Sequence, residues 1–200
     1  MIIRVESKEQ LDICLDIVHK SFQTVADEMN LTKDNCSSYT AFMPIEKLIS
    51  QFENDAPMFL YQYNGYFAGY FSLSINDDSV ELNNLAVLPE YRHLGIGKEL
   101  VDYAITYSKN ILGANKIKIG IVEENTILKE WYEKIGFVHT GTKKFEHLPF
   151  TVGFMETEIW ILSRGQIRIQ FIFEISGEIV MCDICNTIEK SLQGENPFFV

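Results

Sequence analysis

The apolar residues of the first part of the chain follow a strand-like spacing and then a helical spacing. Residues 2–5 are predicted to form a short strand. Ser7 and Gln10 then form a capping box, which is typical of a helix start, and helical spacing continues to about Asn30. Pro44 is well suited to the first position of a second helix. This part therefore predicts one strand followed by two helices.

The middle of the chain predicts three neighbouring strands. Two runs rich in aromatic residues, 57–63 and 66–75, flank Asn64 and Gly65, and this dipeptide between strand-like runs is the strongest short hairpin signal. After a further polar turn, residues 80–88 form a third strand-like run. Because short turns join antiparallel strands, we expect an antiparallel meander.

After residue 88 the pattern changes from hairpins to alternating helices and strands. A helix is predicted over 97–110, a strand over 116–122, a helix over 126–135, and two strands over 137–144 and 150–161. A strand, a helix and a strand in succession favour a parallel pair joined by a right-handed crossover. The complete order is strand, two helices, three strands, helix, strand, helix and two strands. It predicts an α/β fold in which a mixed (α+β) sheet carries helices on its faces.

Composition limits the classes of partner. The 200 residues carry a formal net charge of −11, which argues against nucleic acid because binding to phosphates needs a basic surface. The same charge suits a cationic substrate such as an amine, although acidity also simply keeps a protein soluble. No apolar run is long enough to cross a membrane, and the first residues do not resemble a secretory signal. We therefore expect a cytoplasmic protein that binds neither nucleic acid nor membranes.

A glycine-bearing loop between a strand and a helix provides the most specific chemical signal. The sequence Arg92-His-Leu-Gly-Ile-Gly97 follows the strand-like run and Pro89, and it directly precedes a helix. Backbone N–H groups at a helix start have no partners inside the helix and lie in the positive field of its dipole, so the loop predicts a phosphate site. A P-loop is excluded because no Gly-Lys-[Ser/Thr] ends the loop, and the preceding antiparallel strands argue against a dinucleotide-binding fold.

This loop resembles the coenzyme A loop of the GNAT N-acyltransferase superfamily. A second motif of that family resembles the segment that runs from Asn125 through Tyr132 to Gly136 and Phe137. The two motifs are correctly ordered, and the resemblance covers about residues 1–160. It implies the GNAT fold and the transfer of an acetyl group from acetyl-coenzyme A (acetyl-CoA) to a primary amine, by direct attack in a ternary complex.

The resemblance also implies roles for individual residues. The backbone of Leu85 and Val87, in the strand-like run, would pair with the pantetheine arm of coenzyme A. The loop would hold the pyrophosphate, and Asn125 would lie on the far side of the cofactor cleft. The cofactor-binding residues implied in this way are Leu85, Ala86, Val87, Arg92, His93, Leu94, Gly95, Ile96, Gly97, Lys98 and Asn125.

Acyl transfer to an amine needs a proton donor for the leaving thiolate, and the resemblance implies that Tyr132 is this donor. A tyrosine has a reference pKa near ~10, so it is protonated at neutral pH. The alternative is that Tyr132 only packs a helix against the sheet. Glu81 is the best-placed carboxylate for a general base, although a solvated residue at a strand start is the alternative. Asn83 and Asn84 occupy positions where members of the family often carry an acid, and their amides cannot accept a proton.

Residues 162–200 fit this plan poorly and are predicted to form a C-terminal extension, which divides the chain into 1–161 and 162–200. Its pattern is that of a hairpin and a short helix. Cys182 and Cys185 have a spacing found in zinc sites, but a structural zinc site needs four ligands and no second such pair is present. We therefore expect no metal. Residues 181–200 weakly resemble the start of a histidine-triad (HIT) hydrolase chain, without its His-x-His-x-His motif.

The sequence leaves the acceptor and the assembly open. The acceptor depends on the least patterned parts, residues 20–55 and 143–152, so a small-molecule amine and a peptide amine, at a protein N-terminus or on a lysine, both fit. A further alternative is a protein of the same fold that binds coenzyme A as a sensor or interaction module without transferring an acyl group. A homodimer is also compatible with the sequence.

Overall fold

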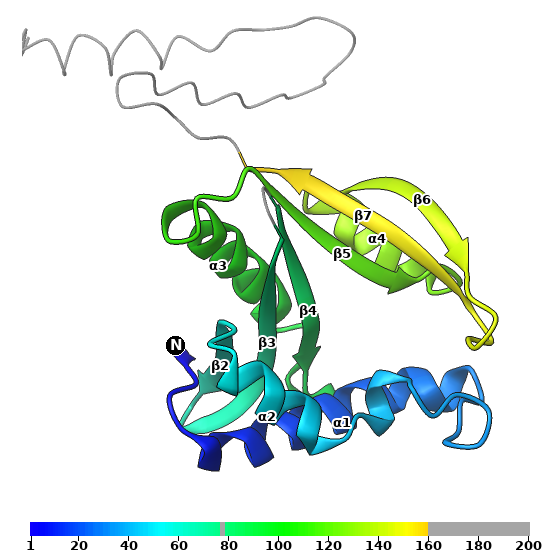
Figure 1. Ribbon diagram of the computed structural model, residues 1–200, viewed down its shortest axis with the longest axis horizontal. Helices are drawn as coiled ribbons and strands as arrows, with labels where there is room; N and C mark the ends of the chain where they lie inside the picture. Colours follow the sequence, from blue (N-terminus) through cyan, green and yellow to red (C-terminus); the bar gives the residue numbers. More distant parts are fainter. Residues whose placement is uncertain (77–78, 160–200) are drawn as a thin grey trace, which may run out of the picture. The chain divides into compact units, whose positions relative to one another are not determined.

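The computed structural model describes residues 1–76 and 79–159, which form a seven-stranded mixed sheet with helices on both faces (Figure 1). The strands are β1 (Ile2–Arg4), β2 (Met58–Tyr63), β3 (Tyr66–Asn76), β4 (Ser79–Val87), β5 (Lys116–Val122), β6 (Val138–Lys144) and β7 (Thr151–Glu158). The α-helices are α1 (Leu11–Glu28), α2 (Ile45–Glu53), α3 (Ile96–Asn110) and α4 (Thr126–Lys134). Short 3₁₀ turns, η1 (Lys8–Gln10), η2 (Thr40–Phe42) and η3 (Pro89–Tyr91), precede α1, α2 and α3. The predicted order of elements is confirmed, with ends that differ by a few residues.

The strands lie in the order β1-β2-β3-β4-β5-β7-β6. All neighbouring strands are antiparallel except β4 and β5, which run parallel and are joined through α3, as the strand–helix–strand pattern predicted. Between β2 and β3, Asn64 and Gly65 have φ angles of 47° and 85°. Both therefore adopt the left-handed conformation that a two-residue type I′ hairpin requires, and the predicted hairpin is confirmed.

Alternate side chains of the central strands enter two different cores, one on each face of the sheet. On β2, Phe59 and Tyr61 pack with α3, whereas Met58 and Leu60 pack with α1 and α2. This alternation follows from the two-residue period of a strand. We call the two sides of the sheet the α3/α4 face and the α1/α2 face.

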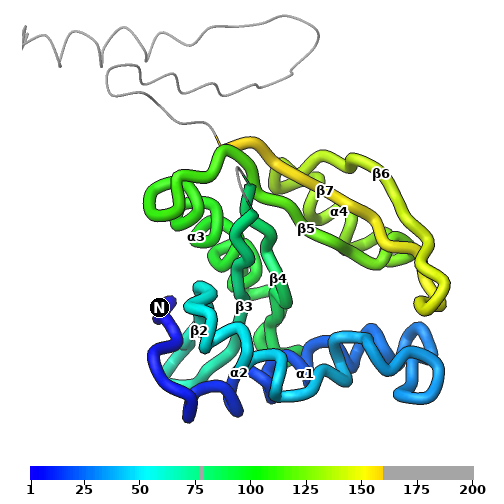
Figure 2. The backbone as a smooth tube through the Cα atoms, in the orientation of Figure 1, coloured from blue at the N-terminus to red at the C-terminus, as the bar shows by residue number. Residues whose placement is uncertain are grey.

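A third apolar cluster ties α1 to the connection between β6 and β7. Tyr39 lies at its centre, with its ring centroid 5.8 Å from that of Phe150 and 6.2 Å from that of Phe22 on α1. The rings meet edge to face, which is a favourable geometry for aromatic pairs. In Figure 2 the tube that follows α1 accordingly runs beside the β6–β7 connection.

No helix within residues 1–76 and 79–159 has both the length and the apolarity that crossing a bilayer requires. The hairpin, the short helix and the cysteine pair that were predicted for the C-terminal extension lie outside the described residues. The division of the chain at residue 161 and the resemblance to HIT proteins therefore stay predictions.

Leu100 provides a test of the core on the α3/α4 face. Its side chain is fully buried, and its Cδ1 lies so close to Gly69 of β3 that a Cβ there would be only 2.9 Å away. Replacing Leu100 by alanine removes these contacts and leaves a cavity, so the free energy of unfolding should fall by about 2–5 kcal/mol. Urea unfolding followed by circular dichroism measures this change.

Leu94→Ala is the matched control, because Leu94 is 51% exposed. The same substitution there should change the free energy of unfolding by less than about 0.5 kcal/mol. An equal loss in the two variants would contradict the burial assigned to Leu100.

Candidate active site

β4 and β5 are paired over only three residues and then separate. Their parallel register joins Ser79–Glu81 to Lys116–Lys118, and Figure 1 shows the two strands moving apart beyond these pairs. β5 remains paired with β7 as far as Val122, and β4 with β3 as far as Val87. The β4 backbone from Leu82 onward therefore has no strand partner on its β5 side among the described residues. Such a free edge, here called the β4–β5 divergence, can pair with an extended ligand.

A bulge in β4 accompanies the separation of the strands. Asn84 has a φ of 52°, a left-handed conformation that asparagine adopts more easily than most residues, and the β3–β4 register shifts beside it. Before the bulge, Leu82 packs on the α3/α4 face. After it, Ala86 packs on the α1/α2 face, while Leu85 packs against the α3/α4 core. The extra residue thus bends β4 where β5 leaves it.

The loop after β4 leaves backbone N–H groups free at the start of α3. His93 and Gly95 have φ angles of 63° and 83°, so the backbone turns sharply at both residues. Along α3, Glu99 is the first residue whose N–H forms a backbone hydrogen bond, which it donates to the Gly95 carbonyl at 3.1 Å. The three N–H groups before it in the helix lie in the positive field of the helix dipole. The loop can therefore hold an anion through its backbone.

Gly97 lies where α3, α4 and β4 approach one another. A Cβ at this position would lie 3.5 Å from the Trp131 ring and 3.9 Å from Val87. Any longer side chain would have to displace the indole ring. Gly97 therefore lets α4 pack against the first turn of α3.

Both basic side chains of the loop are bonded to other groups. The Arg92 guanidinium donates hydrogen bonds to the Ser21 carbonyl (2.8 Å), to Thr24 Oγ1 (3.1 Å) and to a main-chain carbonyl at the end of β4 (3.3 Å). The Lys98 ammonium lies 2.6 Å from the Asp102 carboxylate on the exposed side of α3. Arg92 thus connects α1 to the end of β4, and the backbone supplies the free donors of the loop.

Asn125 begins α4 at the end of β5. Its Oδ1 accepts a hydrogen bond from the Leu128 N–H at 3.0 Å, so Asn125 caps the helix. The cap fixes the start of α4 shortly after the end of β5. A role of Asn125 in holding a cofactor stays a prediction.

Tyr132 is buried on α4 in the core of the α3/α4 face. Its ring centroid lies 4.8 Å from that of Trp131 and 5.3 Å from that of Phe137. Leu85 of β4 and Ile119 of β5 belong to the same core. No residue in the described part of the chain forms a hydrogen bond with its hydroxyl, and burial raises the pKa of Tyr132 well above its usual value. The phenol is therefore protonated across the physiological pH range and free to donate.

The carboxylates near the divergence differ in their partners. Glu81 lies in the last parallel pair, opposite Lys118, and its carboxylate has no ion-pair partner within residues 1–76 and 79–159. Glu123, at the end of β5, binds Lys129 of α4 and lies 3.0 Å from His139 Nε2 on β6. The hydrogen bond from Lys129 is the main reason why the pKa of Glu123 lies below its ordinary value. Glu123 thus links β5, α4 and β6, whereas Glu81 is not held in an ion pair among the described residues.

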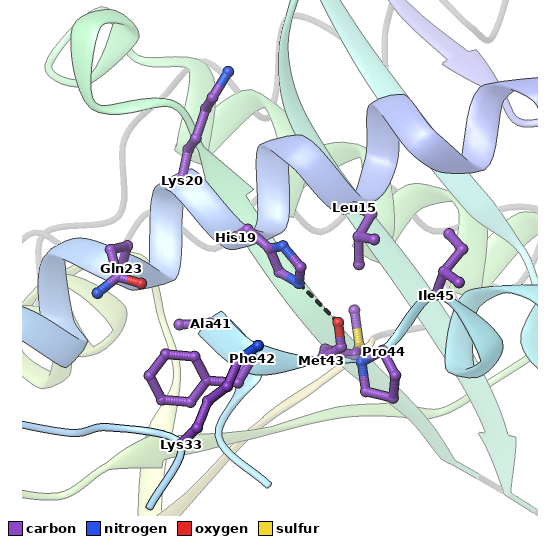
Figure 3. Close-up of a pocket in the computed structure, with 10 residues that line it drawn as sticks. All are labelled: Leu15, His19, Lys20, Gln23, Lys33, Ala41, Phe42, Met43, Pro44 and Ile45. Atoms are coloured by element: carbon purple, nitrogen blue, oxygen red, sulfur yellow. Dashed lines mark hydrogen bonds between the residues drawn. The ribbon is translucent and has the colours of Figure 1, made fainter. Parts of the chain in front are cut away.

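Two openings adjoin α1. The smaller, of about 180 Å³, lies between the end of α1 at Glu28 and the start of α4 at Asn125, beside the end of β5. The larger, of about 630 Å³, lies between α1 and the segment before α2, where His19 Nε2 lies 2.7 Å from the Met43 carbonyl oxygen (Figure 3). None of the residues predicted to be catalytic or to bind the cofactor lines the larger opening, but most of its lining belongs to residues 20–55, on which the acceptor was expected to depend.

The sequence is similar to those of known acetyltransferases. A sequence model of the Acetyltransferase (GNAT) family matches residues 24–137. Over 85 residues the chain is 31% identical to uncharacterized N-acetyltransferases of Mycobacterium tuberculosis and Mycobacterium bovis, and the match covers 42% of this chain and 54% of each relative. The chain thus matches about half the length of these curated relatives.

Solved structures share the fold at low sequence identity. The N-acetyltransferase PaiA of Thermoplasma acidophilum, in complex with coenzyme A, has a TM-score of 0.66 at 21% identity, covering 79% of this chain and 99% of that one. The ribosomal-protein-S18-alanine N-acetyltransferase of Escherichia coli has a TM-score of 0.65 at 16% identity, covering 84% and 98%. Because the family model matches more than half of the chain and the fold agrees, the protein belongs to the GNAT acetyltransferase family.

Proposed function

We propose that this protein transfers an acetyl group from acetyl-CoA to a primary amine of a small molecule or a peptide, by direct attack in a ternary complex. The observation that carries the proposal is the β4–β5 divergence. At its open end lies a loop whose free N–H groups can bind an anion, and the protonated phenol of Tyr132 is buried in the core to which side chains of both strands contribute. Membership of the GNAT family supports the same activity.

The residues of the divergence fit the shape of acetyl-CoA, in which an anionic diphosphate is joined to an extended arm that ends in a thioester. The loop from Arg92 to Lys98 offers backbone N–H groups to the diphosphate. The free edge of β4 from Leu85 to Val87 offers main-chain groups to the amides of the arm. Asn125, which caps α4 after the end of β5, is assigned to the opposite side.

Acetyl-CoA supplies an activated acetyl group as a thioester. The residues of the chain must then stabilise the negative charge that develops on the carbonyl oxygen and transfer protons to sulfur and from nitrogen. A main-chain N–H of β4 near Leu85 is assigned to the oxyanion that develops on the carbonyl. Tyr132 is assigned to the leaving sulfur, and Glu81 to the surplus proton of the amine. In the transfer the N–C bond forms, the C–S bond breaks, sulfur receives the proton of Tyr132, and Glu81 accepts a proton from nitrogen directly or through water.

Release of free thiol with a panel of amines tests the proposed activity. The panel contains polyamines, aminoglycoside antibiotics, amino acids, and peptides with a free N-terminus or a lysine. Thiol release with at least one amine is expected, and the best substrate separates small-molecule from peptide acceptors. Binding of acetyl-CoA without thiol release would instead favour a coenzyme A sensor, and a lack of binding would overturn the donor site as well.

Tyr132→Phe tests the general acid. The variant keeps the aromatic packing and loses the proton, so kcat should fall by about 100-fold or more while the Kd for coenzyme A stays within about twofold. Because burial raises the pKa of Tyr132, loss of this proton should not reduce the wild-type kcat up to about pH 10. Steady-state kinetics and calorimetry measure these quantities.

Tyr103→Phe serves as the control for Tyr132→Phe, because Tyr103 lies in the middle of α3, stacked on Tyr107. This variant should keep its turnover. A Tyr132→Phe variant with full turnover would show that the ring only packs.

Gly95→Glu and Gly95→Gln test the phosphate loop as a matched pair. Both side chains impose the same strain at a φ of 83°, and a Cβ at Gly95 meets nothing within 4 Å. Only the glutamate adds a negative charge beside the free N–H groups. The Kd for coenzyme A should therefore rise about tenfold more for Glu than for Gln, which corresponds to roughly 1.4 kcal/mol. Equal Kd values by calorimetry would remove the loop from the anion site.

A further inference from the structure

We infer that the side-chain oxygen of Asn83 accepts a hydrogen bond from the acceptor amine and holds its nitrogen at the closed end of the β4–β5 divergence. This inference rests on the proposed acetyl transfer and adds the residue that positions the nucleophile. Three observations carry it: the place of Asn83 on β4, the open face beside it, and the fixed orientation of its amide.

Asn83 lies where β4 and β5 begin to separate. The last parallel pair is Glu81 with Lys118, and Asn83 is two residues further along β4. The anion-binding loop follows the other end of this free edge, after Val87. Because a strand rises roughly 3.3 Å per residue, a ligand that starts at the loop and follows β4 inward reaches Asn83 after roughly 13 Å. The reactive end of such a ligand therefore arrives beside this residue.

Asn83 lies on the face of the sheet opposite α3 and α4. Val80 and Leu82 pack in the α3/α4 core, so the alternation of side chains along the strand places Glu81 and Asn83 on the other face. Tyr132 belongs to the α3/α4 core. The amine and Tyr132, which is assigned to protonate sulfur, would thus lie on opposite sides of the bound acetyl-CoA. This arrangement suits a nucleophile that attacks from one side while the leaving group departs on the other.

β5 contributes no side chain next to Asn83. Continued from the last parallel pair, the register puts Gly120 level with Asn83. Gly120 is exposed, and a Cβ built on it would meet only Val152 within 4 Å, at 3.7 Å. Phe154 pairs with Gly120 from β7 and is 39% exposed. An amine can therefore approach from this side, with the Phe154 ring as an apolar neighbour for its carbon chain.

The amide of Asn83 has only one orientation that satisfies its neighbours. Its Nδ2 donates hydrogen bonds to Ser74 Oγ at 2.9 Å and to the Glu81 carbonyl oxygen at 3.2 Å. Because a carbonyl oxygen only accepts, the nitrogen of the amide must face Glu81 and the oxygen must face away. No described residue donates to this oxygen. It therefore remains as an oriented acceptor for a donor that comes from outside the protein.

Substitutions of Asn83 and Ser74 test the inference. Asn83→Leu keeps the number and branching of the side-chain heavy atoms and removes the amide oxygen, so the KM for the best amine of the panel should rise about tenfold or more. Ser74→Ala removes one of the two bonds that orient the amide and should raise this KM about threefold. The Kd for coenzyme A, measured by calorimetry, should stay within about twofold in both variants.

The split between amine KM and coenzyme A Kd separates the proposed role from a structural one. If Asn83 only supported the bulge at Asn84, Asn83→Leu would distort the free edge of β4 and weaken coenzyme A binding instead. An unchanged amine KM in Asn83→Leu overturns the inference. If thermal unfolding shows that this variant is not folded, Ser74→Ala decides, and an unchanged KM there overturns the inference.

A binding measurement keeps this inference distinct from the proposed transfer. The panel amines are titrated into wild-type protein and the Asn83→Leu variant, each saturated with coenzyme A. A wild-type protein that binds an amine but releases no thiol would refute the transfer, while weaker binding by the variant would still support Asn83. Equal amine affinity in the two proteins, or no amine binding at all, overturns the inference.

Discussion

The end of pairing between β4 and β5 after Glu81 and Lys118 is the constraint on which the rest of the site depends. Unpaired main-chain N–H and C=O groups inside a sheet are costly unless water or a ligand satisfies them. The bulge at Asn84 bends β4 at this point, and the cores on both faces keep the strands in place. A ligand with amide groups of its own restores the missing hydrogen bonds. The interruption that weakens the sheet therefore creates the proposed donor site.

α1 connects the two sides of this interruption. On the β4 side, a carbonyl and a hydroxyl oxygen of α1 accept hydrogen bonds from Arg92. On the β7 side, Phe22 of α1 contacts Tyr39, which in turn contacts Phe150 before β7. One polar and one aromatic set of contacts thus fix α1 relative to both halves of the sheet. Arg92 belongs to this frame through its side chain, while its backbone begins the anion-binding loop.

The order of elements and the glycine-bearing turn before α3 could be predicted because they rest on local signals, such as a glycine at residue 95 directly before a helical spacing. Contacts between distant segments leave no such signal. The guanidinium of Arg92 binds a carbonyl 71 residues away, and Glu123 meets His139 only because β6 pairs with β7, the neighbour of β5 in the sheet. The bend at which β4 leaves β5 has a left-handed conformation at Asn84. A glycine would have signalled this conformation in the sequence, but the residue is an asparagine. The sequence therefore predicted the parts of the site and not its shape.

The two groups assigned to the amine and to sulfur are both neutral, and this suits acyl transfer. An amine attacks only in its unprotonated form, and a carboxylate bonded to nitrogen would favour the ammonium form, because an opposite charge raises the pKa of a base. The amide oxygen of Asn83 orients nitrogen without a full negative charge. Burial keeps Tyr132 protonated, so sulfur can receive a proton from a neutral phenol. Glu81, two residues from Asn83 on the same face, is needed only once the N–C bond forms and nitrogen becomes acidic. Separating the anchor from the carboxylate thus keeps the amine nucleophilic until it reacts.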